Sequence, residues 1–279
     1  MPESKLAKWF PGRVVSLGRK TKRLTQTDVA NFLGKNYQTI AKMEQGKSCP
    51  SVGDCYALAD LLELSDELRD YMIDIARNEA QSNFRSDRRF NALCLQMAER
   101  FMGEIRKWEP YLLPGIVQTR AYHFNIVAMS QQSSDERLDG GWKFKVERYE
   151  ALLARKDGPK IVILISAEAL QNLRFLSEAD RREQLERLDY LDSLPNWEIR
   201  IITDLYPRSA TAFDLYRPAD AEFGGPAFVY TEVWDDSYCI EEALRIERYD
   251  GLWKILLGKS ISLKEHLDGR RDGVAEEHS

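Results

Sequence analysis

Residues 24–46, LTQTDVANFLGKNYQTIAKMEQG, constrain the fold most, because they contain two short amphipathic segments separated by a glycine. Thr25 can cap the first segment as a helix, and Asp28 stands where a capping box places an acid. Gly34 can end that helix in the left-handed conformation, which costs glycine little. Asn36 can then cap a second helix. The spacing therefore predicts two helices joined by a tight turn.

The second of these helices has a mixed outward face. Ile40 and Met43 would point inward at a spacing of three residues. The residues left pointing outward are Tyr37, Gln38, Ala41 and Lys42. A glutamine amide can pair with adenine in the major groove, and a lysine can reach guanine or phosphate. This face favours a DNA-reading helix. The alternative is a packed helical pair with no role in DNA binding.

Polar side chains beside the two helices can reach the DNA backbone. Gln26 and Asn36 lie at the helix starts, where their amides and the free backbone N–H groups can hold phosphates. Lys47 and Ser48 follow the second helix and are placed to do the same.

Charge is distributed unevenly along the chain. The net charge is −5, yet residues 1–50 carry ten lysines and arginines against three acids, which gives +7. The rest of the chain carries −12, from 30 basic and 42 acidic residues. A basic head on an acidic body is expected if only the head meets a polyanion such as DNA.

With these residues in place, the head resembles the lambda-repressor-like, or XRE, helix-turn-helix family over roughly residues 13–64. The matching positions are Thr25-Gln26, Ala30, Gly34, Thr39-Ile40, Glu44 and Gly46. The resemblance implies a structural ion pair between Arg19 and Glu44. It also implies a DNA-facing set of Gln26, Tyr37, Gln38, Thr39 and Lys42. Tyr37 is bulky for the first base-reading position, so we expect it to pack on a sugar or a thymine methyl.

The apolar pattern predicts two domains. A polar stretch, residues 78–89, interrupts the pattern and is typical of a boundary. The expected parts are an all-α helix-turn-helix domain (residues 8–76), a linker (77–89), a larger mixed α/β, or α+β, domain (90–267) and a disordered tail (268–279).

The expected second domain mixes helices and strands. Apolar residues over 90–108 recur every three or four positions, which predicts a helical stripe. Residues 160–166 (KIVILIS) predict a buried strand, residues 197–203 (WEIRIIT) alternate with a period of two, and residues 227–234 (AFVYTEVW) predict another strand. A charged helix is expected over 178–194. Strands separated by helices indicate a mixed fold.

Residues 109–122, EPYLLPGIVQTRAY, carry a second resemblance. They are similar to the signature of a C-terminal domain of unknown function that follows XRE readers in many actinobacterial regulators, the WhiJ-like ones among them. The later blocks LPNWEIRII and VYTEVWDDSYCIEE extend the similarity over roughly residues 90–265. The resemblance implies a regulator that is often paired with a small protein encoded nearby. It implies no catalytic residues.

The sequence offers little for catalysis or metal binding. Four cysteines form no CxxC pair and there are only three histidines, so we expect neither a disulfide framework nor a zinc site. His123 lies in no nucleophile motif. The acidic pairs 235–236 and 241–242 are typical of solvated strand and helix ends. We expect no enzyme activity, no cofactor and no metal.

Nothing in the sequence predicts a membrane segment. The longest apolar run, residues 161–165, is far shorter than a membrane span, and the N-terminal MPESKLAKWF lacks the apolar stretch of an export signal. A cytoplasmic protein is expected.

These patterns together predict a sequence-specific transcriptional regulator, with repression favoured. One reading helix covers too few base pairs to select an operator, so a homodimer on an inverted repeat of double-stranded DNA is expected. The second domain would dimerise and bind a small protein partner. Two alternatives stay open: a DNA-binding half of a toxin–antitoxin-like pair, and a ligand sensor. The sensor would have a pocket lined by Trp142, Tyr190, Trp197, Phe223, Tyr230 and Trp234.

Overall fold

The structure is a computed structural model that describes residues 4–78, 85–86, 88–131, 135–207, 210–218, 224–233 and 237–276. Of residues 78, 85–86, 88–92, 130–131 and 270–276 only the backbone is described. The chain has a helical N-terminal region followed by a region of helices and a mixed sheet, which confirms the predicted all-α and α+β classes.

The chain divides into two compact units. Unit 1 comprises residues 1–103 and 216–246, and unit 2 comprises residues 104–215 and 247–279. Unit 1 therefore combines the N-terminal helices with strands from the second half of the chain. This division differs from the boundary expected at residues 77–89, a range that lies partly outside the described residues.

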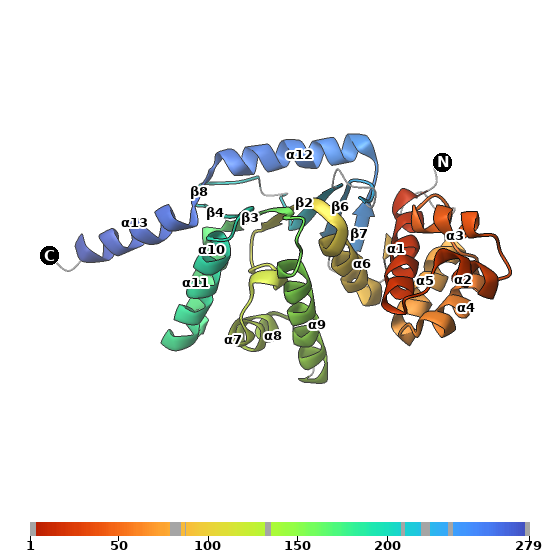
Figure 1. Ribbon diagram of the computed structural model, residues 1–279. Helices are drawn as coiled ribbons and strands as arrows, with labels where there is room; N and C mark the ends of the chain where they lie inside the picture. The colour runs from red at the N-terminus through yellow and green to blue at the C-terminus, as the bar shows by residue number, and fades with distance from the viewer. Residues whose placement is uncertain are drawn as a thin grey trace. The chain divides into compact units, whose positions relative to one another are not determined.

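The N-terminal part of unit 1 consists of five helices (Figure 1). They are α1 (Lys5–Thr21), α2 (Gln26–Phe32), α3 (Tyr37–Glu44), α4 (Val52–Leu62) and α5 (Asp66–Asn78). Thr25 begins α2 with a complete capping box, and the Asn36 side chain caps α3. Gly34 follows α2 in the left-handed conformation, at φ +66°, which a helix C-terminus favours.

The rest of unit 1 contains helix α6 (Arg88–Phe101) and a small antiparallel ladder. Strands β1 (Arg85–Ser86), β7 (Ser237–Ile240) and β6 (Phe228–Glu232) lie in that order, followed by the end of β5 (Phe213–Pro218). Buried Cys94 of α6 and Cys239 of β7 place their sulfur atoms 3.8 Å apart as free thiols. The four cysteines of the chain form no disulfide.

Unit 2 is built on the strand order β5-β2-β3-β4-β8. Strands β2 (Met102–Glu109), β3 (Lys160–Ser166) and β4 (Trp197–Ile202) run parallel, and β8 (Ser260–Ser262) joins β4 antiparallel. In the register of β3 and β4, Ile163 lies opposite Ile199. These side chains are fully buried. Strand β3 is buried at six of its seven positions, which explains its nearly continuous apolar run, whereas β4 interrupts its apolar residues with Glu198 and Arg200.

Helices cover both faces of this sheet (Figure 1). Helix α12 (Ala243–Gly258) lies on one side, and α9 (Asp135–Leu153) and α11 (Glu178–Asp192) lie on the other. Short helical segments complete the connections: η1 (Gly115–Val117), α7 (Arg120–Tyr122), η2 (His123–Val127), α8 (Ala128–Gln131), α10 (Ala167–Gln171) and η3 (Asn172–Phe175).

The expected helical stripe over residues 90–108 is only partly present, because the chain changes from α6 to β2 at Met102. Met102, Ile105 and Trp108 are fully buried at every third position of β2, which is the spacing of a helix. Between them Lys107 is buried at 3% exposure and pairs with Asp214 of β5, Nζ to Oδ2 at 2.5 Å. A buried lysine looks like a solvent-facing position until its distant partner is known. The helix prediction is therefore wrong for residues 102–108.

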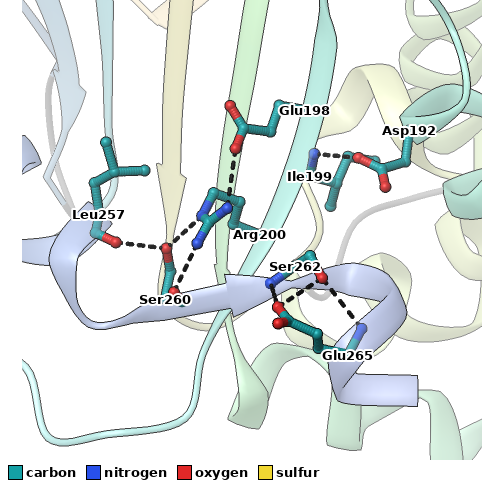
Figure 2. Close-up of polar contacts among 8 residues, drawn as sticks. All are labelled: Asp192, Glu198, Ile199, Arg200, Leu257, Ser260, Ser262 and Glu265. Carbon is teal, nitrogen blue, oxygen red and sulfur yellow. Dashed lines mark hydrogen bonds and ion pairs between the residues drawn. The ribbon is translucent and has the colours of Figure 1, made fainter. Parts of the chain in front are cut away.

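Polar contacts around Arg200 fix the edge strand β8 to β4 (Figure 2). The Arg200 guanidinium donates to both the hydroxyl and the carbonyl oxygen of Ser260 at 2.8 Å, which holds β8 against β4. Ser262 and Glu265 then form a reciprocal cap that begins α13 (Leu263–Glu276). A helix thus continues through Glu276 where a disordered tail was expected from residue 268, and residues 277–279 lie outside the described residues.

Within the described ranges, no helix is both long enough and apolar enough to cross a membrane.

Candidate nucleic-acid interface

Helices α2 and α3 form a compact pair whose inner and outer faces differ in chemistry. Val29, Ala30, Ile40 and Met43 are buried between α1, α2 and α3. On the outer face of α3, Tyr37 is 55% exposed, and Gln38 and Lys42 are exposed beside it. The half-buried Ala41 keeps this face flat between the longer side chains.

An ion pair beneath this face ties α1 to α3. Arg19 donates to Glu44 through Nε at 2.5 Å and Nη2 at 2.9 Å, a bidentate arrangement, and also donates to the Leu24 carbonyl at 2.8 Å. Glu44 is only 5% exposed. Because the charges lie at the base of the helix pair, Arg19 positions the reading helix and does not face outward.

Gln26 joins the same network. Its amide nitrogen donates to the second Glu44 oxygen at 2.9 Å. Burial alone would raise the pKa of the Glu44 carboxyl, but the hydrogen bonds from Arg19 and Gln26 outweigh burial and hold this pKa below its ordinary value. The Gln26 side chain is therefore oriented at the start of α2, half-buried against Glu44.

Asn36 and Thr39 are joined to each other at the start of α3. The Asn36 side-chain oxygen accepts from the Thr39 backbone N–H at 2.9 Å and from the Thr39 hydroxyl at 3.0 Å. Capping thus uses the Asn36 oxygen, while its amide N–H₂ group lies at the exposed helix start.

Two lysines give this surface its charge. Lys42 and Lys47 are exposed and have no acidic partner among the described residues. By contrast, Lys22 pairs with Glu63, and Lys35 pairs with Asp54 at 3.2 Å. Lys42 and Lys47 are therefore available to a polyanion.

Ser48 is the sequence-predicted residue that the structure does not bring to this surface. Its hydroxyl oxygen is buried and has no hydrogen-bond partner within the described ranges. The other seven predicted DNA-binding residues, Gln26, Asn36, Tyr37, Gln38, Thr39, Lys42 and Lys47, are exposed or half-buried on α2, α3 and the turn that follows.

Unit 2 contains a second polar cluster, around Lys145. The ammonium donates to Gln118 Oε1 at 2.6 Å and lies 2.9 Å from His123 Nδ1, and His123 Nε2 lies 2.9 Å from the Leu138 carbonyl. Burial, together with Arg148, lowers the pKa of Lys145 to about 7. His123 is thus fixed on both ring nitrogens inside a structural network.

The aromatic residues expected to line one ligand pocket are dispersed. Tyr230 is buried in unit 1, whereas Trp142, Tyr190 and Trp197 belong to unit 2. Phe223 and Trp234 lie outside the described residues. A groove of about 1050 Å³ does exist in unit 2 between η3, α11 and α13, but none of the six residues lines it. In the parts of the chain that the structure describes, no group of three or more His, Cys, Asp or Glu side chains could hold a metal ion.

Comparison with known proteins agrees with this geometry. Residues 18–68 match the family model described as Helix-turn-helix, and residues 95–267 match the Domain of unknown function (DUF5753). No curated protein matches the chain.

The matched helix-turn-helix and its exposed third helix place the protein in the class of DNA-binding regulators. The DUF5753 match covers more than half of the chain, and the chain belongs to that family.

Proposed function

We propose that the protein is a sequence-specific transcriptional repressor that inserts α3 into the major groove. The observation that carries this proposal is the outer face of α3, where exposed Gln38 and Lys42 flank the half-buried Ala41 on a helix positioned from below by Glu44. The Gln38 amide would read adenine, and Lys42 would reach guanine or phosphate. Exposed Tyr37 would pack on a sugar or a thymine methyl.

The residues around α3 would hold the DNA backbone. Gln26 and Asn36 would add their amide donors to the free N–H groups at the starts of α2 and α3, with Thr39 beside them. Lys47 would contact a phosphate from the turn after α3. Ser48 would join this set only if its buried hydroxyl became accessible on binding. Arg19 and Glu44 would act as the structural ion pair.

One α3 covers too few base pairs to select an operator, so the proposed binding species is a homodimer on an inverted repeat. Its half-sites would lie about one helical turn apart. Selection of bound duplexes from a random pool by the full-length protein tests this arrangement. Enrichment of an inverted repeat bound by two chains supports it. Enrichment of a single unrepeated site bound by one chain would contradict it.

The acidic remainder of the chain is proposed to mediate dimerisation and to bind a small protein, which a gene nearby would encode. Its net charge of −12 suits a basic partner. A DNA-binding half of a toxin–antitoxin-like pair is one form of this role.

The groove of unit 2 supports a second candidate function, that of a ligand-sensing regulator. Leu170, Leu173 and Leu185 line it together with charged residues such as Arg174 and Glu186. Most of the lining residues are polar or charged, and a cleft that combines apolar surface with fixed polar groups can hold a small molecule. A thermal-shift screen with cell metabolites tests this candidate. A ligand whose stabilising effect disappears in Leu185→Glu would support it, and no shift with any metabolite fraction would count against it.

Lys47 offers a test of backbone contact that does not depend on sequence readout. Lys47→Ala should weaken binding to all DNA sequences alike and should reduce the slope of log affinity against log salt by about 1, because one phosphate contact is lost. Titrations at several salt concentrations measure this slope. Lys22→Ala is the matched control, since Lys22 already pairs with Glu63; an equal change in both variants would contradict the contact.

A further inference from the structure

The carboxyl ends of β2, β3 and β4 meet at one edge of the unit 2 sheet, because these three strands are parallel neighbours. The residues that follow them are Pro110-Tyr111, Ala167-Glu168 and, after β4, Leu205-Tyr206. In open sheets of this kind, the carboxyl edge is where binding sites concentrate. We call Tyr111, Glu168, Leu205 and Tyr206 the edge patch.

The edge patch exposes apolar surface that the fold itself does not use. Leu205 is 86% exposed and Tyr111 is 64% exposed. Tyr206 packs edge-on against buried Trp108 with ring centroids 5.1 Å apart and is itself half-buried. Clustered exposed side chains of this size are typical of interaction surfaces.

One unpaired negative charge lies among these side chains. Glu168 is exposed, and its Oε2 atom lies 3.5 Å from the Tyr206 hydroxyl. It has no cationic partner among the residues that the structure describes. Neighbouring Asp204, by contrast, is already paired with Lys259 at 3.1 Å. Burial raises the pKa of Tyr206, and Glu168 and Tyr111 raise it further, so the three groups share one electrostatic environment.

The loops that carry the edge patch are held in place before any partner arrives. The Asn172 amide donates to the Tyr111 carbonyl at 2.8 Å, and the Lys259 ammonium donates to the Leu205 carbonyl at 2.6 Å. The Ser166 hydroxyl donates to the Pro110 carbonyl at the base of the patch. A surface fixed in this way loses little conformational entropy when it binds.

We propose that the edge patch docks a protein partner through an arginine or lysine side chain that pairs with Glu168 and lies against the Tyr206 and Tyr111 rings. Leu205 packs on the aliphatic stem of the same side chain or on its apolar neighbour. This inference rests on the proposed partner-binding role of the second domain and assigns that role to the edge patch.

Three features favour a basic protein segment over other occupants. Aromatic rings beside a carboxylate attract a guanidinium or ammonium group. Leu205 is 86% exposed and Tyr111 is 64% exposed, and side chains that protrude this far do not enclose a small ligand, which needs a concave site to bury its surface. A second copy of this chain would bring a body of like charge, −12, to the patch.

The test uses the full-length protein and a phage-displayed library of random linear peptides as the probe. We expect the enriched peptides to contain an arginine or lysine beside apolar residues. Glu168→Gln and Leu205→Ser should each weaken these peptides by about tenfold or more. Glu147→Gln, which removes an equally exposed charge from α9, should leave binding unchanged.

Several outcomes would overturn the proposal. One is enrichment of peptides without a cationic residue, and another is no enrichment at all. Equal peptide binding by Glu168→Gln and the wild type would also overturn it, as would self-association of the protein that Leu205→Ser abolishes. Thermal melting of the variants shows whether they fold. DNA selection with the same variants separates this proposal from DNA reading, because an edge patch variant should keep the base preferences of the wild type.

Discussion

Two buried charges in this protein are each matched by a specific partner. Glu44 is held by Arg19 and Gln26, and Lys107 is held by Asp214. Removing one member of such a pair leaves the other charge buried, at a cost of about 3–5 kcal/mol. The family resemblance pointed to Arg19 and Glu44. Nothing in the sequence pointed to Asp214, because β5 reaches Lys107 only through the tertiary fold.

Lys145 is a half-buried amine whose hydrogen-bond partners, Gln118 and His123, carry no negative charge. Burial with Arg148 outweighs the opposing effect of Glu109 on its pKa. In the folded state its pKa is about 7, against an ordinary value of 10.5. Between these values the unfolded chain binds the proton and the folded chain does not, so this group makes the protein more stable as pH rises from 7 towards 10.5. The slope should approach, at most, about 1.4 kcal/mol per pH unit.

Thermal melts at several pH values test this prediction with Lys145→Met. The variant should lose the rise in stability above pH 7, while Lys143→Met, on the exposed side of the same helix, should keep it. A wild-type profile that falls across this range in parallel with the Lys145→Met profile would show that Lys145 is charged in the fold.

At the scale of elements, the reading helix depends on a close contact between α1 and α3. A Cβ added at Gly12 would lie 2.1 Å from the Met43 carbonyl oxygen, so only glycine allows this approach. Gly12→Ala should therefore separate the helices, destabilise the protein by about 1–3 kcal/mol or more, and weaken DNA binding.

Urea unfolding measures this effect, and Gly53→Ala in α4 is a matched control. A Cβ at Gly53 meets nothing closer than 3.9 Å, so this substitution should be neutral or stabilising by up to about 1 kcal/mol. Equal stability changes in the two variants would contradict the close contact.

Elements with local signals were predictable from the sequence, and elements with distant partners were not. Caps at Thr25 and Asn36 bounded α2 and α3, an unbroken apolar run marked β3, and alternation with a period of two marked β4. Strand β2 was missed because its buried apolar residues, Met102, Ile105 and Trp108, recur every three positions as they would in a helix. The edge patch also escaped sequence analysis. Its one signal was position, since Glu168 and Leu205 closely follow strands that end at the same edge of the sheet.

At the scale of the whole molecule, side-chain hydrogen bonds connect the N-terminal helices to the later part of unit 1, in addition to the continuous backbone. Glu241, which directly follows β7, accepts hydrogen bonds from the Ser4 hydroxyl and, at 2.6 Å, from the Leu6 backbone N–H. These contacts bridge more than two hundred positions of sequence. They supply an acceptor to the backbone N–H groups at the start of α1, which have no hydrogen-bond partner within the helix.

Glu241→Ala should lower the free energy of unfolding by about 1–3 kcal/mol, because buried donors at the start of α1 lose their acceptor. Glu242→Ala, which removes the exposed neighbouring carboxylate, should change stability little. Urea unfolding of the full-length variants makes the comparison. A smaller loss for Glu241→Ala than for Glu242→Ala would contradict the role of this contact.

The central claim is that the outer face of α3 reads base pairs. Selection from a random duplex pool by the wild type, Gln38→Ala and Gln45→Ala tests it most directly, because Gln45 is an equally exposed glutamine at the end of the same helix. We predict that Gln38→Ala loses its preference at one base pair in each half-site, at a cost of about 1–3 kcal/mol, while Gln45→Ala matches the wild type. Identical base preferences in all three proteins would contradict the claim.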